Sequence, residues 1–451
     1  MQKYLFKNIS VVNEGKTSVQ DVFIEKGRIE SIGKSLNIKE KVTEIPGEHK
    51  HLIPGIIDDQ VHFREPGLTH KADIYTESRA AVAGGVTSYM EMPNTVPNTL
   101  THILLENKYT IAEKTSLANY SFYMGVSNQN TDEVLRTNDK RKRVCGIKIF
   151  LGSSTGDMLV DNKITLDKIF SESELLIATH CEDEKIIRNN YESLKQTKPV
   201  LQPSDHPIIR DENACYRSSS SAIELAKKYG SRLHILHIST AQEIGLFDNK
   251  VPLQQKKITS EVCVHHLHFT AYDYEQLGYL IKCNPAIKDS SNKLALWSGL
   301  LNGSLDVIAT DHAPHTLTEK QPPYEKALSG LPLVQHPLLL MLNYYKEGII
   351  SLEKIVEKMS HSVADCFKIE ERGYIREGYF ADLVVLDLQK HTTVNSENIL
   401  YKCGWSPLSG KTFPAIITDT FVNGERVYNS DECGNTSWNE SSKGKRLTFY
   451  R

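Results

Sequence analysis

Short apolar runs recur along most of this 451-residue chain, and helix-like stretches such as 75–83, 218–229 and 292–301 lie between several of them. Eight such units over roughly 320 residues predict a (β/α)8 barrel with loop insertions. A doubly wound sheet is the alternative, but no Gly-x-Gly-x-x-Gly motif follows the first run. The predicted strands are Ile57–His62, Thr87–Met92, Tyr120–Val126, Gly146–Leu151, Leu175–His180, Leu233–Ile238, Ile258–Val264 and Leu305–Thr310.

Both ends of the chain are rich in β patterns. Residues 21–33 predict two strands around a Lys-Gly turn, 381–387 predict one strand, and 416–427 predict a hairpin with an Asn-Gly turn. Because these segments flank the barrel region, we expect residues 1–53 and 374–451 to form one small composite β-sandwich domain. The barrel would then occupy residues 54–373.

Composition excludes several classes of function. The net charge is −3, the sequence pI is about 6.6 and no basic stripe is present, so nucleic acid is not an expected partner. Mean hydropathy is −0.37 and no run of 18 apolar residues occurs, so we expect no membrane span and no signal peptide. No Cys-x-x-Cys pair is present, which is typical of reduced thiols in the cytoplasm. The eight cysteines are Cys145, Cys181, Cys215, Cys263, Cys283, Cys366, Cys403 and Cys433.

Polar side chains stand repeatedly at the ends of the predicted strands, where barrel enzymes carry their chemistry. One histidine at such a place would be unremarkable, but several at corresponding ends indicate a shared site. The candidates are His62 at the end of the first run and Arg64 after it, Asn94 after the second, Lys148 in the fourth, His180 in the fifth, His237 in the sixth, and Asp311 and His315 after the eighth.

Metal ligation explains these residue types. Neutral imidazoles and carboxylates suit Zn²⁺, and a catalytic site leaves one position open for a water whose pKa the metal lowers to about 7. Asp311 can bind metal, accept a proton from that water and deliver it to a leaving nitrogen.

Lys148 is a cation inside an apolar strand. Burial lowers the pKa of a lysine and makes its amine nucleophilic, so that it can add carbon dioxide and become an anionic carbamate ligand. The alternative is a lysine that extends out of the barrel or pairs with a carboxylate.

A set of motifs resembles one known family over essentially the whole chain. In order, the motifs are Pro-Gly-x-Ile-Asp and His-x-Arg-Glu-Pro-Gly, Met-Pro-Asn-Thr, Gly-x-Lys-x-Phe, His-x-Glu-Asp, His-x-Ser, Asn-Pro-x-x-Lys and Asp-His-Ala-Pro-His. Residues 373–384 add a stretch similar to the tail strand that enters the β-sandwich of these proteins. The chain resembles the dihydroorotases, which are cyclic amidohydrolases of the amidohydrolase superfamily.

This resemblance implies a site and a reaction. Arg64, Asn94 and His315 would hold a substrate carboxylate, Arg64 with a bidentate fork, and Asn284 would touch the pyrimidine ring. The reaction would interconvert L-dihydroorotate and N-carbamoyl-L-aspartate in pyrimidine synthesis, with one or two Zn²⁺ ions per subunit and a possible homodimer. The implied metal ligands are His62, Lys148 as a carbamate, His180, His237 and Asp311, of which Asp311 is also the catalytic acid and base.

Gln60 departs from the family pattern, which has a histidine at this position. A neutral amide offers a metal only its carbonyl oxygen. Three possibilities follow: two metals with one held weakly, one metal beside Lys148, His180 and His237, or an inactive relative. The retained Asp311 and the carboxylate binders favour an active enzyme.

Other polar residues have plainer interpretations. Glu182 is expected to accept a hydrogen bond from His180, whereas His265 and His266 are expected to be structural or to support the ligands. His234 is assigned to the core, and the role of His312 stays open. Residues 67–71 and 330–333 are expected to form mobile loops over the mouth of the barrel.

Two other functions compete with this one. A hydantoinase or allantoinase would share the metal set and the fold, but a neutral ring needs no carboxylate clamp. A non-catalytic dihydroorotase-like scaffold subunit is the other, and Gln60 is its only support in the sequence.

Overall fold

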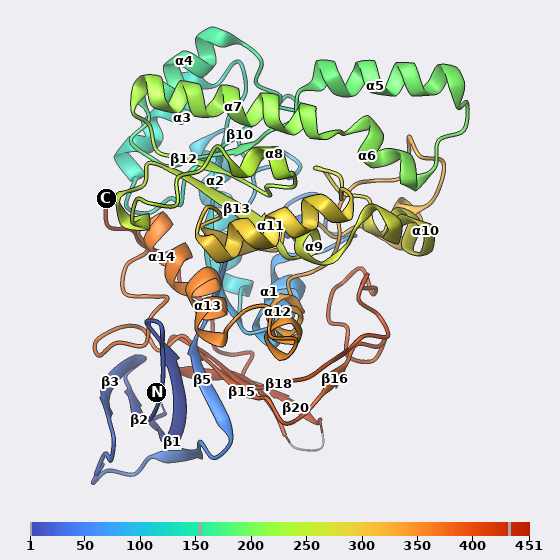
Figure 1. Ribbon diagram of the computed structural model, residues 1–451. Coiled ribbons are helices and arrows are strands. Elements are labelled where there is room, and N and C mark those ends of the chain that lie inside the picture. The colour runs from blue at the N-terminus through green and yellow to red at the C-terminus, as the bar shows by residue number, and fades with distance from the viewer. Residues whose placement is uncertain (1, 153–155, 432–433) are drawn as a thin grey trace.

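A barrel of parallel strands and helices lies beside a sheet built from both ends of the chain (Figure 1). The computed structural model describes residues 2–152, 156–431 and 434–451. Among these residues, no helix is long and apolar enough to cross a bilayer.

Every predicted barrel run contains a strand, and the third run contains two short ones. Six neighbouring strands run in the order β14-β13-β12-β11-β10-β9 and three in the order β6-β7-β8, all of them parallel. A bridge between Val61 and His312 joins β6 to the end of β14, where the His62 N–H donates to the His312 carbonyl at 2.7 Å. The strands are β6 (Ile56–Val61), β7 (Val86–Glu91), β8 (Asn119–Phe122), β9 (Met124–Gly125), β10 (Ile147–Phe150), β11 (Ile177–His180), β12 (Leu233–Ile235), β13 (Ile258–Cys263) and β14 (Val307–Ala309).

Local capping signals set the ends of the outer helices. Asp73 and Thr76 form a capping box at the start of α1, because each side chain accepts a hydrogen bond from the other residue's backbone N–H. Gly230 and Gly303 end α7 and α11 in the left-handed conformation, with φ of 70° and 86°. The helices are α1 (Ile74–Ala83), α2 (His102–Thr115), α3 (Thr131–Leu135), α4 (Lys163–Glu172), α5 (Glu184–Thr197), α6 (His206–Ile209), α7 (Glu212–Tyr229), α8 (Ala241–Ile244), α9 (Val264–His268), α10 (Tyr274–Leu277), α11 (Ser290–Asn302), α12 (Pro337–Lys346), α13 (Leu352–Val356) and α14 (Ser362–Phe367).

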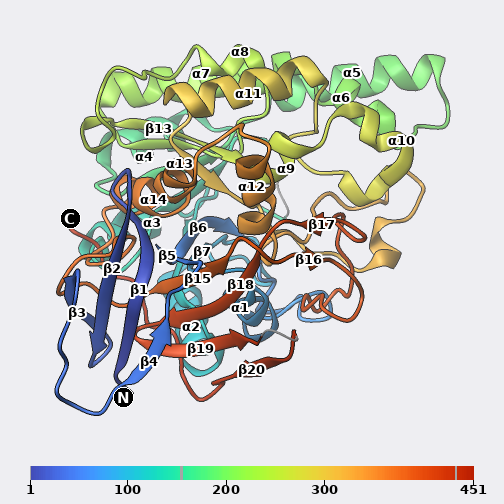
Figure 2. The ribbon, with the colours of Figure 1, turned by 60° about the horizontal axis from the view of Figure 1, so that its bottom comes forward.

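The two chain ends meet in one nine-stranded sheet, in the order β20-β19-β18-β15-β5-β1-β2-β3, with β4 paired to β1. β5 and β15 pair antiparallel at the junction, and Figure 2 shows the blue and red strands side by side there. The predicted hairpin turns at Asn423 and Gly424, both with positive φ. The strands are β1 (Tyr4–Asn13), β2 (Lys16–Glu25), β3 (Arg28–Gly33), β4 (Thr43–Pro46), β5 (Lys50–Pro54), β15 (Leu383–Asp387), β18 (Ile416–Val422), β19 (Glu425–Ser430) and β20 (Thr436–Trp438), while β16 (Thr392–Thr393) and β17 (Thr412–Phe413) form a separate ladder.

The last residues of the chain return to the barrel. Arg446 forms a parallel β-bridge with Tyr120 of β8, and the Leu447 N–H donates to the Tyr120 carbonyl at 2.9 Å. Leu447 and Phe449 are fully buried in a cluster that also contains Phe367 of α14. The division of the chain into two domains stays a prediction, and residues 444–451 lie against the barrel rather than in the terminal sheet.

Apolar side chains fill one end of the barrel. Met90, Leu236 and Val307 point inward there and contact the α14 segment, including Phe367. Because that end is closed by apolar packing, the polar side chains gather at the other end, where the strands reach their carboxyl termini.

Candidate active site

One cavity of about 810 Å³ brings together every site residue that the sequence predicts. It opens at the carboxyl ends of the barrel strands, and its lining comes from several distant segments of the chain. The predicted residues that line it are His62, Arg64, Asn94, Lys148, His180, His237, Asn284, Asp311 and His315.

Lys148 lies on β10 and points into the barrel beside His180 and His237. His180 Nδ1 and His237 Nε2 are 3.0 Å apart, and Lys148 Nζ lies 4.5 Å from the Phe150 ring centroid. The lysine is 1% exposed, and among the described residues no hydrogen bond or ion pair holds its Nζ. Lys148 therefore neither extends to solvent nor pairs with a described carboxylate.

Burial governs the charge state of this group. It lowers the pKa of Lys148 to about 8, although the carboxylates of Asp311 and Glu261 act in the opposite direction. It also lowers the pKa of His237 well below its usual range, helped by His180 and Lys148. A neutral imidazole is the form of histidine that binds metal. A deprotonated amine is the form of lysine that adds carbon dioxide.

His62 and Asp311 form the facing half of the site. The His62 Nδ1 lies 2.7 Å from Asn94 Oδ1, to which it can donate, so a neutral His62 keeps a lone pair on Nε2. That Nε2 is 3.1 Å from Asp311 Oδ1, and the Gln60 amide nitrogen donates to the same oxygen at 3.0 Å. Burial would raise the pKa of Asp311, but when His62 is protonated, its Nε2–H hydrogen bond and its charge outweigh burial and lower that pKa.

The donor set fits a bound divalent metal. In neutral His62, Nε2 carries a lone pair and lies 3.1 Å from Asp311 Oδ1, a spacing at which both atoms can bind one cation. His180 gives its other nitrogen to Glu182 at 3.0 Å, the supporting contact expected for a metal-binding imidazole. Gln60 Oε1 is buried without a hydrogen-bond partner among the described residues. The prediction for Glu182 is thus confirmed as a contact, whereas metal identity and a carbamate on Lys148 stay predictions.

Three residues of the cavity have strained backbones. Arg64, His237 and Asp311 have φ of 68°, 39° and 47°, in the left-handed region that L-residues avoid. Such strain costs of order 1–3 kcal/mol per residue and persists where the surroundings enforce it. Glu261 enforces it at His237, because its Oε1 accepts the His237 backbone N–H at 2.9 Å.

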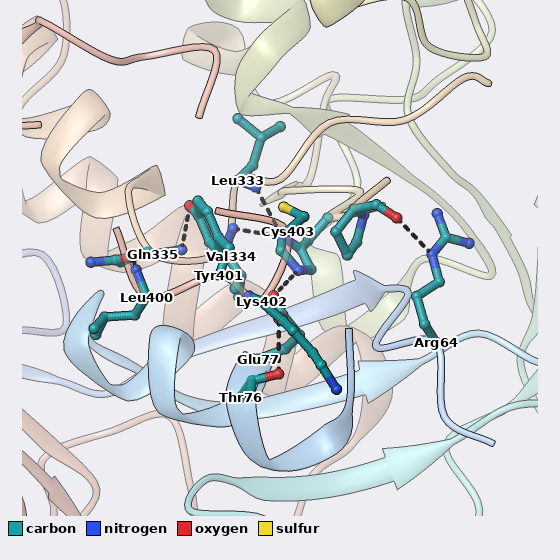
Figure 3. A network of polar contacts seen from close by, with 12 residues as sticks. Arg64, Thr76, Glu77, Leu333, Val334, Gln335, Leu400, Tyr401, Lys402 and Cys403 are labelled. Carbon is teal, nitrogen blue, oxygen red and sulfur yellow. Dashed lines mark hydrogen bonds and ion pairs between the residues drawn. The ribbon is translucent and has the colours of Figure 1, made fainter. Parts of the chain in front are cut away.

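Cationic side chains gather at the other end of the cavity. Arg64 uses its Nε to donate to the Pro314 carbonyl at 3.1 Å, as Figure 3 shows at the right. Its Nη2 lies 3.2 Å from His315 Nε2. Burial lowers the pKa of Arg64 to about 10, so the guanidinium stays charged at neutral pH and can bind an anion.

The tautomer of His315 is fixed by two contacts that the sequence did not reveal. Lys71 Nζ can only donate, and it lies 3.0 Å from His315 Nδ1. With Nδ1 accepting from Lys71, a neutral His315 carries its proton on Nε2 and donates it to the Ser329 carbonyl at 3.0 Å, so the Arg64 Nη2 at 3.2 Å is a close contact of Nε2 and not its hydrogen-bond donor. Burial, Arg64 and Lys71 hold the pKa of His315 well below its usual range, so the ring is neutral.

His312, whose role the sequence left open, anchors a loop rather than the chemistry. Its Nε2 lies 2.7 Å from Glu77 Oε2 of α1, and its Nδ1 accepts from the N–H groups of Leu333 and Val334. The network extends from Glu77 to the Lys402 backbone (Figure 3). Loop mobility at 330–333 stays a prediction.

The other residues that the sequence singled out lie at the cavity wall or are buried in the protein. Asn284 Oδ1 lies 3.1 Å from His206 Nε2 at the cavity wall. His265 and His266 are buried, and His266 Nε2 lies 3.1 Å from the Pro285 carbonyl. His234 is fully buried, as predicted.

Known proteins match this chain along most of its length. Residues 51–427 match the model of the family described as "Amidohydrolase family". The chain is 33% identical over 442 residues to a dihydroorotase of Methanosarcina acetivorans, covering 94% of this chain and 92% of that protein. It is 31% identical over 424 residues to a dihydroorotase of Pyrococcus abyssi, covering 91% of this chain and 94% of that protein.

Solved structures with the same fold include hydantoinases. The L-hydantoinase (dihydropyrimidinase) from Arthrobacter aurescens superposes with a TM-score of 0.91 at 25% identity, over 99% of this chain and 100% of that one. The dihydropyrimidinase from Brevibacillus agri NCHU1002 superposes with a TM-score of 0.88 at 23% identity, over the full length of both chains. The chain therefore belongs to the amidohydrolase family of hydrolytic enzymes.

Proposed function

We propose that this protein is a dihydroorotase, which interconverts L-dihydroorotate and N-carbamoyl-L-aspartate in pyrimidine synthesis. The observation that carries the proposal is the buried pair of the charged Arg64 guanidinium and the neutral His315 ring, in the same cavity as Lys148, His180 and Asp311. A substrate with a carboxylate beside its cyclic amide would place the carboxylate at Arg64 and His315 and the amide near Lys148, His180 and Asp311. The many relatives named dihydroorotase support the same conclusion.

His62, Lys148, His180, His237 and Asp311 would hold the metal, with Lys148 as a carbamate. When bound, Zn²⁺ supplies polarisation of the ring carbonyl and lowers the pKa of water at the site. The remaining work falls to the side chains of this chain.

In the hydrolytic direction, Asp311 accepts the proton of the attacking water as its oxygen bonds to the ring carbonyl carbon. The carbon–nitrogen bond then breaks, and Asp311 returns the proton to the departing nitrogen. Arg64 holds the substrate carboxylate with its Nη atoms, while Asn94 and His315 flank it. Asn284 would touch the ring. Ring closure follows the same steps in reverse.

A substrate panel tests the proposal against the hydantoinase alternative. The purified, zinc-loaded protein should turn over dihydroorotate and carbamoyl-aspartate in preference to hydantoin and allantoin. Turnover of only the two neutral rings would refute the assignment. Absence of both activity and bound zinc would instead support the scaffold alternative that Gln60 raises.

A charge variant tests the clamp itself. Arg64→Gln removes a buried partner of the substrate carboxylate, a loss that costs about 2–5 kcal/mol in comparable pairs. We therefore expect kcat/KM for dihydroorotate to fall at least 30-fold, while slow turnover of a neutral ring changes little. Equal losses on both substrates would show that Arg64 supports the fold rather than the carboxylate. A homodimer and a cytoplasmic location stay predictions.

A further inference from the structure

A second group of metal-type donors lies deeper in the barrel than the cavity. Asp59 of β6, His234 of β12 and Glu261 of β13 are all fully buried, and none of them lines the cavity. One donor atom from each of the three side chains lies within 4.8 Å of the other two. We call these residues the lower triad. It is placed between the His237 backbone, which Glu261 holds, and the ring of Phe367 at the closed end, 5.5 Å from the His234 ring.

The lower triad has more acceptor atoms than the surrounding described residues satisfy. Both oxygens of Asp59, the Oε2 of Glu261 and the Nε2 of His234 are buried without a hydrogen bond to any residue that the structure describes. Burying two carboxylates with unmet lone pairs costs several kcal/mol unless a cation or donors compensate them.

The orientation of His234 differs from that of other histidines paired with carboxylates. His180 with Glu182 and His312 with Glu77 are aligned as hydrogen bonds, at 3.0 and 2.7 Å. His234 Nε2 lies 3.1 Å from Asp59 Oδ2 and 3.8 Å from Glu261 Oε2, yet it is aligned with neither oxygen. Donors around one tetrahedral zinc lie roughly 3.3–3.6 Å apart without pointing at each other. The spacing and misalignment match a shared cation better than a hydrogen bond.

In its neutral form, His234 keeps a lone pair on Nε2, because Nδ1 has an oxygen partner on the other side of the ring. The Thr259 hydroxyl donates to the Leu233 carbonyl at 3.3 Å, so its oxygen can accept from His234 Nδ1 at 2.8 Å. An imidazole whose Nδ1–H is given to an oxygen keeps Nε2 free as a ligand, the arrangement typical of metal-binding histidines.

We propose that Asp59, His234 and Glu261 form a second, structural metal site that binds one divalent transition metal such as Zn²⁺ beneath the catalytic cavity. Two carboxylate oxygens and one imidazole nitrogen suit zinc and its first-row neighbours. The site does not depend on the proposed dihydroorotase activity. Because it is closed off from solvent, its metal should exchange slowly with chelators.

The test counts metal per chain by elemental mass spectrometry in protein produced with Zn²⁺. Asp59→Asn should lose one equivalent of metal relative to the parent. Asp58→Asn is the matched control, because Asp58 is an equally buried carboxyl of β6 whose Oδ2 accepts from the Thr310 hydroxyl at 2.6 Å. It should retain the full complement.

A second variant keeps the test decisive if Asp59→Asn does not fold. The double variant Lys148→Ala/His180→Ala removes ligands of the cavity and leaves the lower triad intact. It should retain one equivalent of zinc, with an anomalous scattering peak between Asp59, His234 and Glu261. A metal-free double variant, or an Asp59→Asn protein with unchanged metal content, would overturn the proposal and leave an imidazolium or a water to bridge the carboxylates.

Discussion

Lys148 offers a prediction in which function and stability oppose each other. In metal-free protein without carbon dioxide, its ammonium is buried away from water, which lowers its pKa from 10.5 to about 8. Each tenfold change in an equilibrium is worth about 1.4 kcal/mol, so the protonated lysine costs the folded state about 3 kcal/mol at pH 7. Lys148→Met removes that cost and fills similar space. We expect this variant to be inactive and yet about 3 kcal/mol more stable than the metal-free parent.

The sign of the pH dependence makes the prediction specific. A lysine whose pKa is lowered by folding destabilises the folded state below that pKa, and the penalty fades as pH rises toward the unfolded value. The advantage of the variant should therefore shrink from about 3 kcal/mol at pH 7 to roughly 1.4 kcal/mol at pH 9.5. Urea unfolding of both metal-free proteins in degassed buffer at the two pH values measures it. A gap that is absent at pH 7, or that does not narrow by pH 9.5, would refute the reasoning.

Three further predictions concern the metal-binding group at Gln60, the contact of Lys71 with His315, and the loop that His312 holds. Gln60→His should raise zinc binding by up to one equivalent per chain in a calorimetric titration, because imidazole replaces an amide oxygen; unchanged stoichiometry and affinity would contradict it. Lys71→Met should raise KM for dihydroorotate about tenfold with kcat nearly unchanged, since His315 loses the contact that fixes its tautomer; an equal fall in kcat would count against this role. His312→Ala should lower the free energy of unfolding by about 3 kcal/mol, because Glu77 Oε2 and the N–H groups of Leu333 and Val334 lose their hydrogen-bond partner in a buried place; a loss below 1 kcal/mol in urea would refute it.

The sequence predicted the barrel and the convergence of its donors for one physical reason. Strand runs such as 175–180 are short, apolar and end in a polar residue, and parallel strands bring such ends to one rim. Lys148 and His180 could therefore be placed together without knowledge of the helices between them. The contact of His180 with Glu182 follows from two residues of spacing and was equally accessible.

Contacts between loops could not be predicted in the same way. Lys71 and His315 lie 244 residues apart in the chain, and neither sits in a periodic segment. His312 stands beside Asp311 in sequence, yet the backbone turns it toward Glu77 and away from the cavity. Residues 444–451 fall within the predicted terminal domain by their position in the chain alone, but Leu447 and Phe449 are buried in a cluster with Phe367 of α14.

Strand β6 shows where the period of two fails and why that matters. Strict alternation would place Gln60 and His62 on one face of the strand and Asp59 on the other. The pairing of β6 with β7 shifts register between Asp58 and Val61, so that one extra residue is accommodated. Asp59 and Gln60 then both reach the barrel interior, one toward His234 and the other toward Asp311. A bulge in one strand thus supplies side chains to the cavity and to the lower triad at once, which regular pleating could not do.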